Sequence, residues 1–169
     1  MAGCSKCNKV VEPDPTSTAS LPAATQTGAG TFGCMLNGQV WLPVRQGVPL
    51  EMSNPKLVYD PTFEGGSFSL SGTIYADKRS QEAIAIGGRG IGTVGEYNLT
   101  NSGIKFFYDN LTTSYASDMG DITSNCKLTI TKLDKTNAII AGTFSFTIEK
   151  RDTGKKVTVT DGRFDMKYL

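Results

Sequence analysis

Residues 126–150, CKLTITKLDKTNAIIAGTFSFTIEK, contain two runs in which apolar and polar side chains alternate. The runs cover 126–133 and 138–150, and DKTN at 134–137 between them is typical of a turn. Because a period of two marks a half-buried β-strand, the stretch predicts a long antiparallel hairpin. The apolar residues in phase along its second strand are Ile140, Phe144, Phe146 and Ile148.

The segment that follows changes the phase of its alternation. Its apolar residues are odd-numbered at Val157 and Val159 but even-numbered at Phe164 and Met166. Both pairs face one core only if the strand shifts by one residue between them. A β-bulge supplies one extra residue, and glycine tolerates its geometry. We therefore predict a bulge or bend at Asp161-Gly162.

The remainder of the chain also reads as short strands. Asn37-Gly38 lies between apolar runs at 32–36 and 39–42, which is the strongest short signal for a two-residue hairpin. Further strands are predicted at 56–59, 67–75, 82–86, 96–99 and 104–108, with a weak one at 114–116. Without an amphipathic helix, about ten strands predict an all-β antiparallel sandwich. A lipocalin-like closed barrel is the alternative, because consecutive hairpins can also close up-and-down.

The chain has 169 residues, which suits one domain and a tail. Residues 1–31 are rich in Pro, Thr, Ala and Gly, a composition typical of a flexible tether. We therefore expect a tether at 1–31 and a single β domain at 32–169. No run of 18 apolar residues is present, so the sequence predicts no transmembrane helix.

The N-terminus suggests a membrane anchor. Ala2-Gly3-Cys4 resembles the end of a bacterial lipobox, the small-small-Cys signal at which lipoprotein precursors are cut. On this interpretation Met1 replaces a removed leader, and Cys4 carries the lipid that holds the protein in the outer membrane of the cell envelope. The alternative is a cytosolic protein that happens to begin Met-Ala-Gly-Cys.

Composition excludes several classes of function. The chain has no histidine, so Ser-His-Asp and Cys-His hydrolases and most zinc enzymes are excluded. Lys and Arg total 17 against 16 Asp and Glu, and the signs are mixed, so nucleic acid is not an expected partner. We expect no catalytic residues, no metal and no cofactor, and classify the protein as a non-enzyme.

Three cysteines remain besides Cys4. Cys7 lies in the expected tether, whereas Cys34 and Cys126 lie in predicted strands far apart in the sequence. A Cys34–Cys126 disulfide would stabilise the fold in an oxidising envelope. Two buried free thiols acting as small apolar side chains are the alternative.

Three motifs resemble functional sites but lack the expected context. Residues 90–95 fit G-x-G-x-x-G, yet a strand and turn are predicted after them where a dinucleotide site needs a helix. The oxygen-rich loop at 109–125 does not match the spacing of an EF-hand. Asp161 and Asp165, taken with Glu64 or Glu96, offer carboxylates for glycoside hydrolysis, but their separation is unknown.

Trp41 is the only tryptophan and ends the predicted hairpin near Pro43. Exposed tryptophans serve as stacking platforms for sugars, so Trp41 is a candidate for ligand stacking. The alternative is a core position, because tryptophan is highly buried on average.

Four blocks resemble an uncharacterised lipoprotein family of Bacteroidetes-type bacteria. They are LPAATQTG at 21–28, TFGCMLNGQVW at 31–41, GTFSF at 142–146 and TDGRFD at 160–165. The resemblance implies an envelope location and a β-rich domain. The family carries no established activity, so the resemblance transfers no catalytic residues.

These features together predict an envelope-anchored lipoprotein whose β domain binds a glycan, a peptide or another envelope protein without catalysis. A carboxylate-based polysaccharide hydrolase is one alternative, and it requires two carboxyl groups about 5–10 Å apart in a cleft. A lipocalin-like carrier of a small apolar ligand is the other, and it requires a closed barrel with an apolar cavity.

Overall fold

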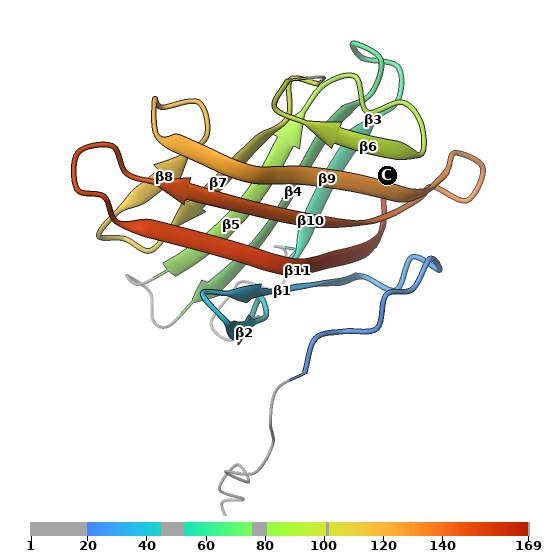
Figure 1. The fold of residues 1–169 in the computed structure, drawn as a ribbon. Helices are drawn as coiled ribbons and strands as arrows, with labels where there is room; N and C mark the ends of the chain where they lie inside the picture. Colours follow the sequence, from blue (N-terminus) through green and yellow to red (C-terminus); the bar gives the residue numbers. More distant parts are fainter. Residues whose placement is uncertain (1–19, 45–52, 76–80, 101, 169) are drawn as a thin grey trace, which may run out of the picture.

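The computed structural model describes residues 20–44, 53–75, 81–100 and 102–168. These residues form eleven strands in two antiparallel sheets, in the orders β2-β1-β11-β10-β9-β6 and β3-β4-β5-β7-β8 (Figure 1). The strands are β1 (Thr31–Leu36), β2 (Gln39–Trp41), β3 (Lys56–Asp60), β4 (Ser67–Tyr75), β5 (Gln81–Gly88), β6 (Gly95–Asn98), β7 (Lys105–Asp109), β8 (Ser114–Ala116), β9 (Ile122–Asp134), β10 (Ile139–Glu149) and β11 (Lys156–Lys167).

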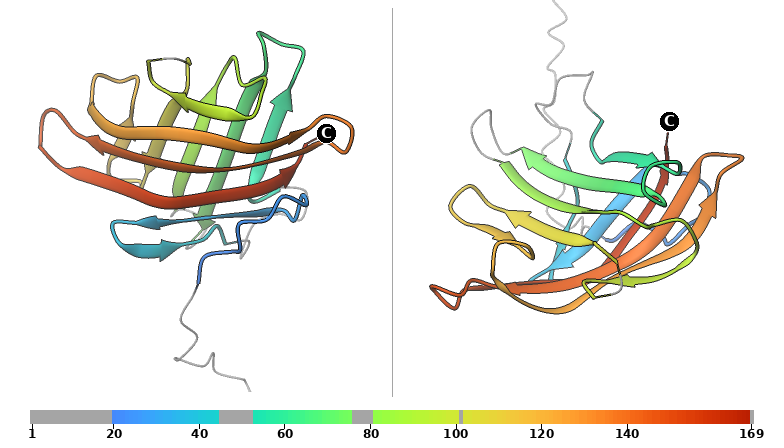
Figure 2. Two further views of the ribbon diagram at one scale, coloured as in Figure 1. Left: turned by 45° about the vertical axis from the view of Figure 1, so that its right-hand side comes forward. Right: turned by 90° about the horizontal axis from the view of Figure 1, so that it is seen from above.

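The two sheets face each other as a sandwich, and their strands cross steeply (Figure 2). Aromatic side chains join the two inner faces. The rings of Phe106 and Phe146 lie 5.2 Å apart, and those of Phe68 and Phe164 lie 5.8 Å apart. Each pair has one ring from each sheet, so the core is a single layer between them.

The predicted antiparallel sandwich is confirmed, and the alternative of a closed barrel is wrong, because each sheet has two unjoined edges. The predicted hairpin is also confirmed: Leu36 pairs with Gln39, and Asn37 and Gly38 both have positive φ, at 50° and 82°. No helix in the described segments has the length and apolar character needed to span a membrane.

Strand β9 is longer than predicted. It begins at Ile122, inside the segment expected to be a polar loop, and its pairing with β10 extends to Glu149. The early residues of the strand are polar or exposed, so their alternation gives no sequence signal. These residues belong to the strand because their backbone pairs with β10, not because of their side chains.

The predicted phase change in the last strand is confirmed. Phe144 pairs with Gly162 and Phe146 pairs with Val159, so β11 uses one residue more than β10 between the two pairs. Asp161 has a φ of 52°, within this bulge. The extra residue lets the early valines and the late Phe164 face the same core.

The domain begins earlier than the expected boundary at residue 31. Residues 20–30, which we call the strap, lie against the outer face of the six-stranded sheet rather than belonging to a free tether. Pro22 and Leu42 occupy the space that a Cβ at Gly33 would need, at 2.9 and 2.6 Å. Pro and Gly exclude regular structure here, but they do not prevent packing, which explains why composition placed the boundary too late.

The strap is held by the carboxylate of Asp165. This side chain is only 1% exposed, on the outer side of β11. It accepts hydrogen bonds from the Thr25 hydroxyl at 2.7 Å and from the backbone N–H groups of Thr27, Gly28 and Ala29 at 2.9, 2.7 and 3.2 Å. Burial alone would raise the pKa of Asp165, but these hydrogen bonds outweigh it and lower the pKa below its usual range.

Gly162→Ala tests the close packing at the bulge. A Cβ at Gly162 would lie 2.5 Å from the Phe144 ring and 2.5 Å from its carbonyl oxygen. We expect a loss of about 2–3 kcal/mol in the free energy of unfolding, measured by denaturant titration. Gly87→Ala is the control, because its Cβ would meet only an ordinary contact at 3.5 Å. Equal stability of the two variants would contradict this account.

Asp165→Asn tests the strap attachment. An amide cannot accept from all these donors, so we expect a loss of about 3 kcal/mol at pH 7. Because the folded pKa is lowered, the stabilisation is complete above the unfolded pKa of about 3.9 and is lost as pH falls through the folded pKa. The stability gap to the parent protein should therefore shrink below about pH 4.

The matched control is Asp161→Asn, an exposed carboxylate on the same strand in a conformation that asparagine also accepts. Its effect should stay within about 0.5 kcal/mol. The difference in the free energy of unfolding between Asp165→Asn and the parent protein could instead stay constant from neutral to acid pH. That result would show that the charge on Asp165 does not hold the strap.

Candidate functional site

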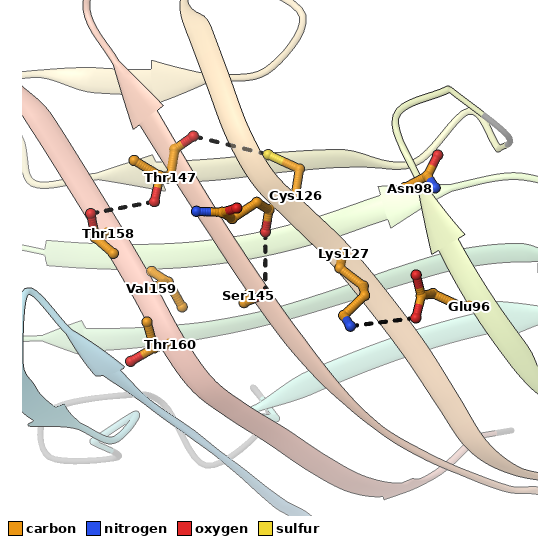
Figure 3. A pocket seen from close by; sticks show the side chains of 10 residues that line it. Glu96, Asn98, Cys126, Lys127, Ser145, Thr147, Thr158, Val159 and Thr160 are labelled. Carbon is orange, nitrogen blue, oxygen red and sulfur yellow. Dashed lines mark hydrogen bonds and ion pairs between the residues drawn. The ribbon is translucent and has the colours of Figure 1, made fainter.

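The main candidate site is an open hollow of about 600 Å³ on the outer face of the six-stranded sheet (Figure 3). Its walls come from β6, β9, β10 and β11. Its lining side chains are Glu96, Asn98, Asn125, Cys126, Lys127, Ser145, Thr147, Thr158, Val159 and Thr160. Most of these carry hydroxyl, amide or charged groups, so we call it the polar hollow.

Two bulges border the polar hollow. The register of β10 shifts against both neighbours between Phe144 and Thr147, because β11 and β9 each carry an extra residue there. Asn125 of β9 has a φ of 53°, matching the conformation of Asp161 on the other side. Bulges bend a strand locally, so the pair deforms the sheet face around Ser145.

The hydroxyls of the polar hollow are arranged to offer both donors and acceptors. Ser145 donates to the carbonyl oxygen of Asn125 at 3.2 Å, which leaves its oxygen lone pairs available to accept. Thr147 donates to the Thr158 hydroxyl at 3.4 Å, which leaves the Thr158 proton available to donate. A ligand rich in hydroxyl groups, each both donor and acceptor, matches this arrangement.

Charges in the polar hollow are balanced. Lys127 pairs with Glu96 at 3.4 Å, and both side chains are about half exposed, so the pair contributes little to stability. Cys126 also lines the hollow, and its thiol donates to the carbonyl of Ser124 at 3.5 Å. Burial raises the pKa of Cys126, which keeps the sulfur in the unreactive thiol form.

A second hollow of about 360 Å³ adjoins the first and shares Lys127 and Ser145 with it. Its other lining residues are Ala24, Thr143, Phe144, Asp161, Gly162 and Arg163. Ala24 belongs to the strap, and Arg163 donates to the carbonyl oxygen of Pro22 at 3.5 Å. The strap therefore forms one wall of this second hollow.

The carboxylates considered for glycoside hydrolysis do not converge. Asp165 is buried beneath the strap, and Glu64 pairs with Arg89 at 2.6 Å in the connection before β4. Glu96 on β6 and Asp161 on β11 are separated by β9 and β10, which is about 14 Å at three strand spacings. Paired glycosidase carboxylates lie about 5–10 Å apart, so none of these combinations forms such a pair.

Trp41 is a core residue, so the prediction of ligand stacking is wrong for this structure. It is 4% exposed and packs edge-on against Phe32, with ring centroids 6.0 Å apart. Its indole N–H donates to Glu82 at 3.0 Å, and Glu82 also accepts from the Tyr108 hydroxyl. The short β2 strand places the ring inward, and Glu82 satisfies its only polar atom.

The suggested Cys34–Cys126 disulfide is not formed, and both thiols are free. Cys34 is on β1 and Cys126 on β9, with β11 and β10 between them. Three strand spacings, about 14 Å, exceed the Cα separation of about 4.4–6.8 Å that a disulfide requires. Burial, with the nearby charge of Glu82, raises the pKa of Cys34 to about 12. Cys4 and Cys7 lie outside the described residues.

The glycine motif at 90–95 leads into strand β6 rather than a helix. Its Ile91 is fully buried, and the Ile91 carbonyl accepts from the Tyr59 hydroxyl at 2.8 Å. The segment therefore closes one end of the core and does not form the strand-turn-helix context of a dinucleotide site.

The three carboxylates of the 109–125 segment are engaged in hydrogen bonds and ion pairs with other protein groups. Asp109 accepts from Leu111 and Ser114, Asp118 pairs with Lys105 at 2.8 Å, and Asp121 pairs with Lys150 at 3.1 Å. In the described part of the chain, no three acidic or cysteine side chains are grouped to hold a metal ion.

Sequence reasoning considered Glu96 and Cys126 for other roles and missed the remaining side chains that line the polar hollow, Ser145 and Thr158 among them. The signal was present, because hydroxyl residues occupy the polar positions of the same alternation that predicts the strands. Their gathering at one place depends on sheet order, with β11 beside β10 and β6 beside β9, which no local pattern contains.

No protein-family model matches this chain, and no curated protein or solved structure shows significant similarity to it.

Proposed function

We propose that this protein is an envelope lipoprotein, anchored through Cys4, whose sandwich binds a glycan in the polar hollow without catalysis. The observation that carries the binding proposal is the lining of the hollow: hydroxyl donors and acceptors beside a balanced ion pair. Sugar hydroxyl groups need partners of both kinds at close spacing.

Of the three ligand classes, a glycan fits this lining better than a peptide or a protein. Peptide grooves provide pockets for side chains, and protein interfaces have apolar, aromatic centres. The large apolar side chains exposed in the described residues do not line the hollow. They are Val44, Val58, Phe63, Val94, Leu111, Met119 and Ile122.

The strap sets the geometry that the proposed anchoring would have. Asp165 holds it at one place on the sheet, so a tether before residue 20 would start from a fixed point on the domain. The 15 residues at 5–19 separate Cys4 from the strap. A chain of that length spans at most about 50 Å when fully extended, which limits how far the domain stands from the lipid.

Cys4→Ser, made in the full-length gene product, tests the anchor. We expect the protein to leave the membrane fraction and to lose the mass of the lipid from its N-terminal peptide, because no thioether bond can form. Cys7→Ser is the matched control and should remain membrane-bound. Native protein with an unmodified Cys4 thiol would overturn the anchoring proposal.

Ser145→Trp tests the binding site by filling the polar hollow. The probes are linear pentasaccharides of glucose, mannose, xylose and N-acetylglucosamine, titrated against the ¹⁵N-labelled protein by NMR. We expect at least one to shift amide signals at 96–98, 125–127, 145–147 and 158–160. Affinity for that sugar should fall at least tenfold in the variant, because the added ring displaces the ligand.

Ser69→Trp is the matched control, because Ser69 is an exposed strand serine on the outer face of the other sheet. It should bind like the parent protein. Binding to none of the four sugars, or equal binding by both tryptophan variants, would contradict a glycan site in the polar hollow.

A further inference from the structure

The two hollows adjoin each other on the outer face of the six-stranded sheet, and we call the two together the path. They share the lining residues Lys127 and Ser145, so a ligand long enough to pass over these two side chains contacts both hollows. The polar hollow spans the sheet from Glu96 on β6 to Thr158 on β11, and the second hollow lies further along β10 and β11, at 143–145 and 161–163, where Ala24 of the strap borders it. The path is therefore longer than the polar hollow alone, and the added length follows the direction of the strands.

The charges along this path balance over its whole length. Lys127 pairs with Glu96 in the first hollow. In the second hollow Arg163 lies beside Asp161 and donates to its carbonyl oxygen at 3.2 Å. Two cations and two anions leave no excess charge to attract an acidic ligand, whereas all four provide hydrogen-bonding groups for neutral hydroxyls.

The strap residue Ala24 forms the end wall of the path, and Asp165 holds the strap in place. Ala24 stands next to Thr25, whose hydroxyl donates to the Asp165 carboxylate at 2.7 Å. The strap is thus fixed in place by a buried group that does not itself line either hollow. A ligand that touches the strap wall binds only when the strap is attached, and by linkage it must also stabilise that attachment.

Resting on the proposed glycan function, we propose that the two hollows are subsites for an extended neutral oligosaccharide. The strap forms the terminal subsite, and its docking on Asp165 is coupled to ligand binding. Short sugars occupy the polar hollow only. Longer ones reach Ala24 and gain affinity from the second subsite.

The test compares the disaccharide and the pentasaccharide of whichever neutral sugar binds best, by calorimetric titration of the parent protein. We expect the pentasaccharide to bind about tenfold more tightly, because it fills both subsites. Ala24→Trp should remove that gain and leave disaccharide binding unchanged. Ala23→Trp is the matched control, since Ala23 is an exposed strap residue that lines neither hollow.

The coupling has its own readout in amide hydrogen exchange. The N–H groups of Thr27, Gly28 and Ala29, which donate to Asp165, should exchange several-fold more slowly when the pentasaccharide is bound. The disaccharide should not slow them. A purely structural strap would show no dependence on the length of the sugar.

Three results would overturn parts of this account separately. Equal affinity of the two lengths, with no effect of Ala24→Trp, refutes the second subsite and leaves the glycan site standing. Tighter binding of a galacturonic acid pentamer than of any neutral sugar refutes the neutral class. Binding of no sugar at all refutes both this inference and the proposed function.

Discussion

The extra residue in β11 determines which side chains of the last strand face the core and which face outward. Before it, Val157 and Val159 point inward, and after it the even-numbered Phe164 does so, while Asp165 points to the outer face. Without the bulge, one of the two apolar sets would face solvent, and if the valines stayed inward, the Asp165 carboxylate would face the aromatic core. Both the continuous core and the outward carboxylate therefore depend on this single irregularity.

The bulge in turn explains the strap. An outward Asp165 is available to the passing N-terminal segment, whose backbone N–H groups have no strand partner of their own. Burying a carboxylate is unfavourable unless hydrogen bonds replace its lost water. The three N–H groups and the Thr25 hydroxyl provide that replacement, and the same bonds satisfy strap donors. Asp165 thus needs the strap in order to be buried, and the strap needs Asp165 in order to stay attached.

The same pair of bulges connects the fold to the proposed binding site. They lie on either side of β10 and border the polar hollow around Ser145. The core takes up Trp41, the side chain considered for ligand stacking, since its apolar area is worth more when buried. The outer face is left with hydroxyl, amide and charged groups, which suit a polar ligand.

Local pattern alone determined much of this protein. The alternation at 126–133 and 138–150, the Asn37-Gly38 turn and the parity change before Phe164 are properties of neighbouring residues, so they predicted strands, a hairpin and a bulge correctly. Composition also excluded histidine chemistry, because residues that are absent cannot act in any fold.

Only the tertiary structure decided which residues that are far apart in the sequence lie close together. The strap packs because Asp165, about 140 residues later in the chain, accepts its hydrogen bonds, and the tether composition of 1–31 holds no sign of that partner. Cys34 and Cys126 stay apart because two strands come between them, and Ser145 meets Thr158 and Lys127 because three strands become neighbours. Sheet order arises from the global burial of apolar faces, and a linear pattern does not contain it.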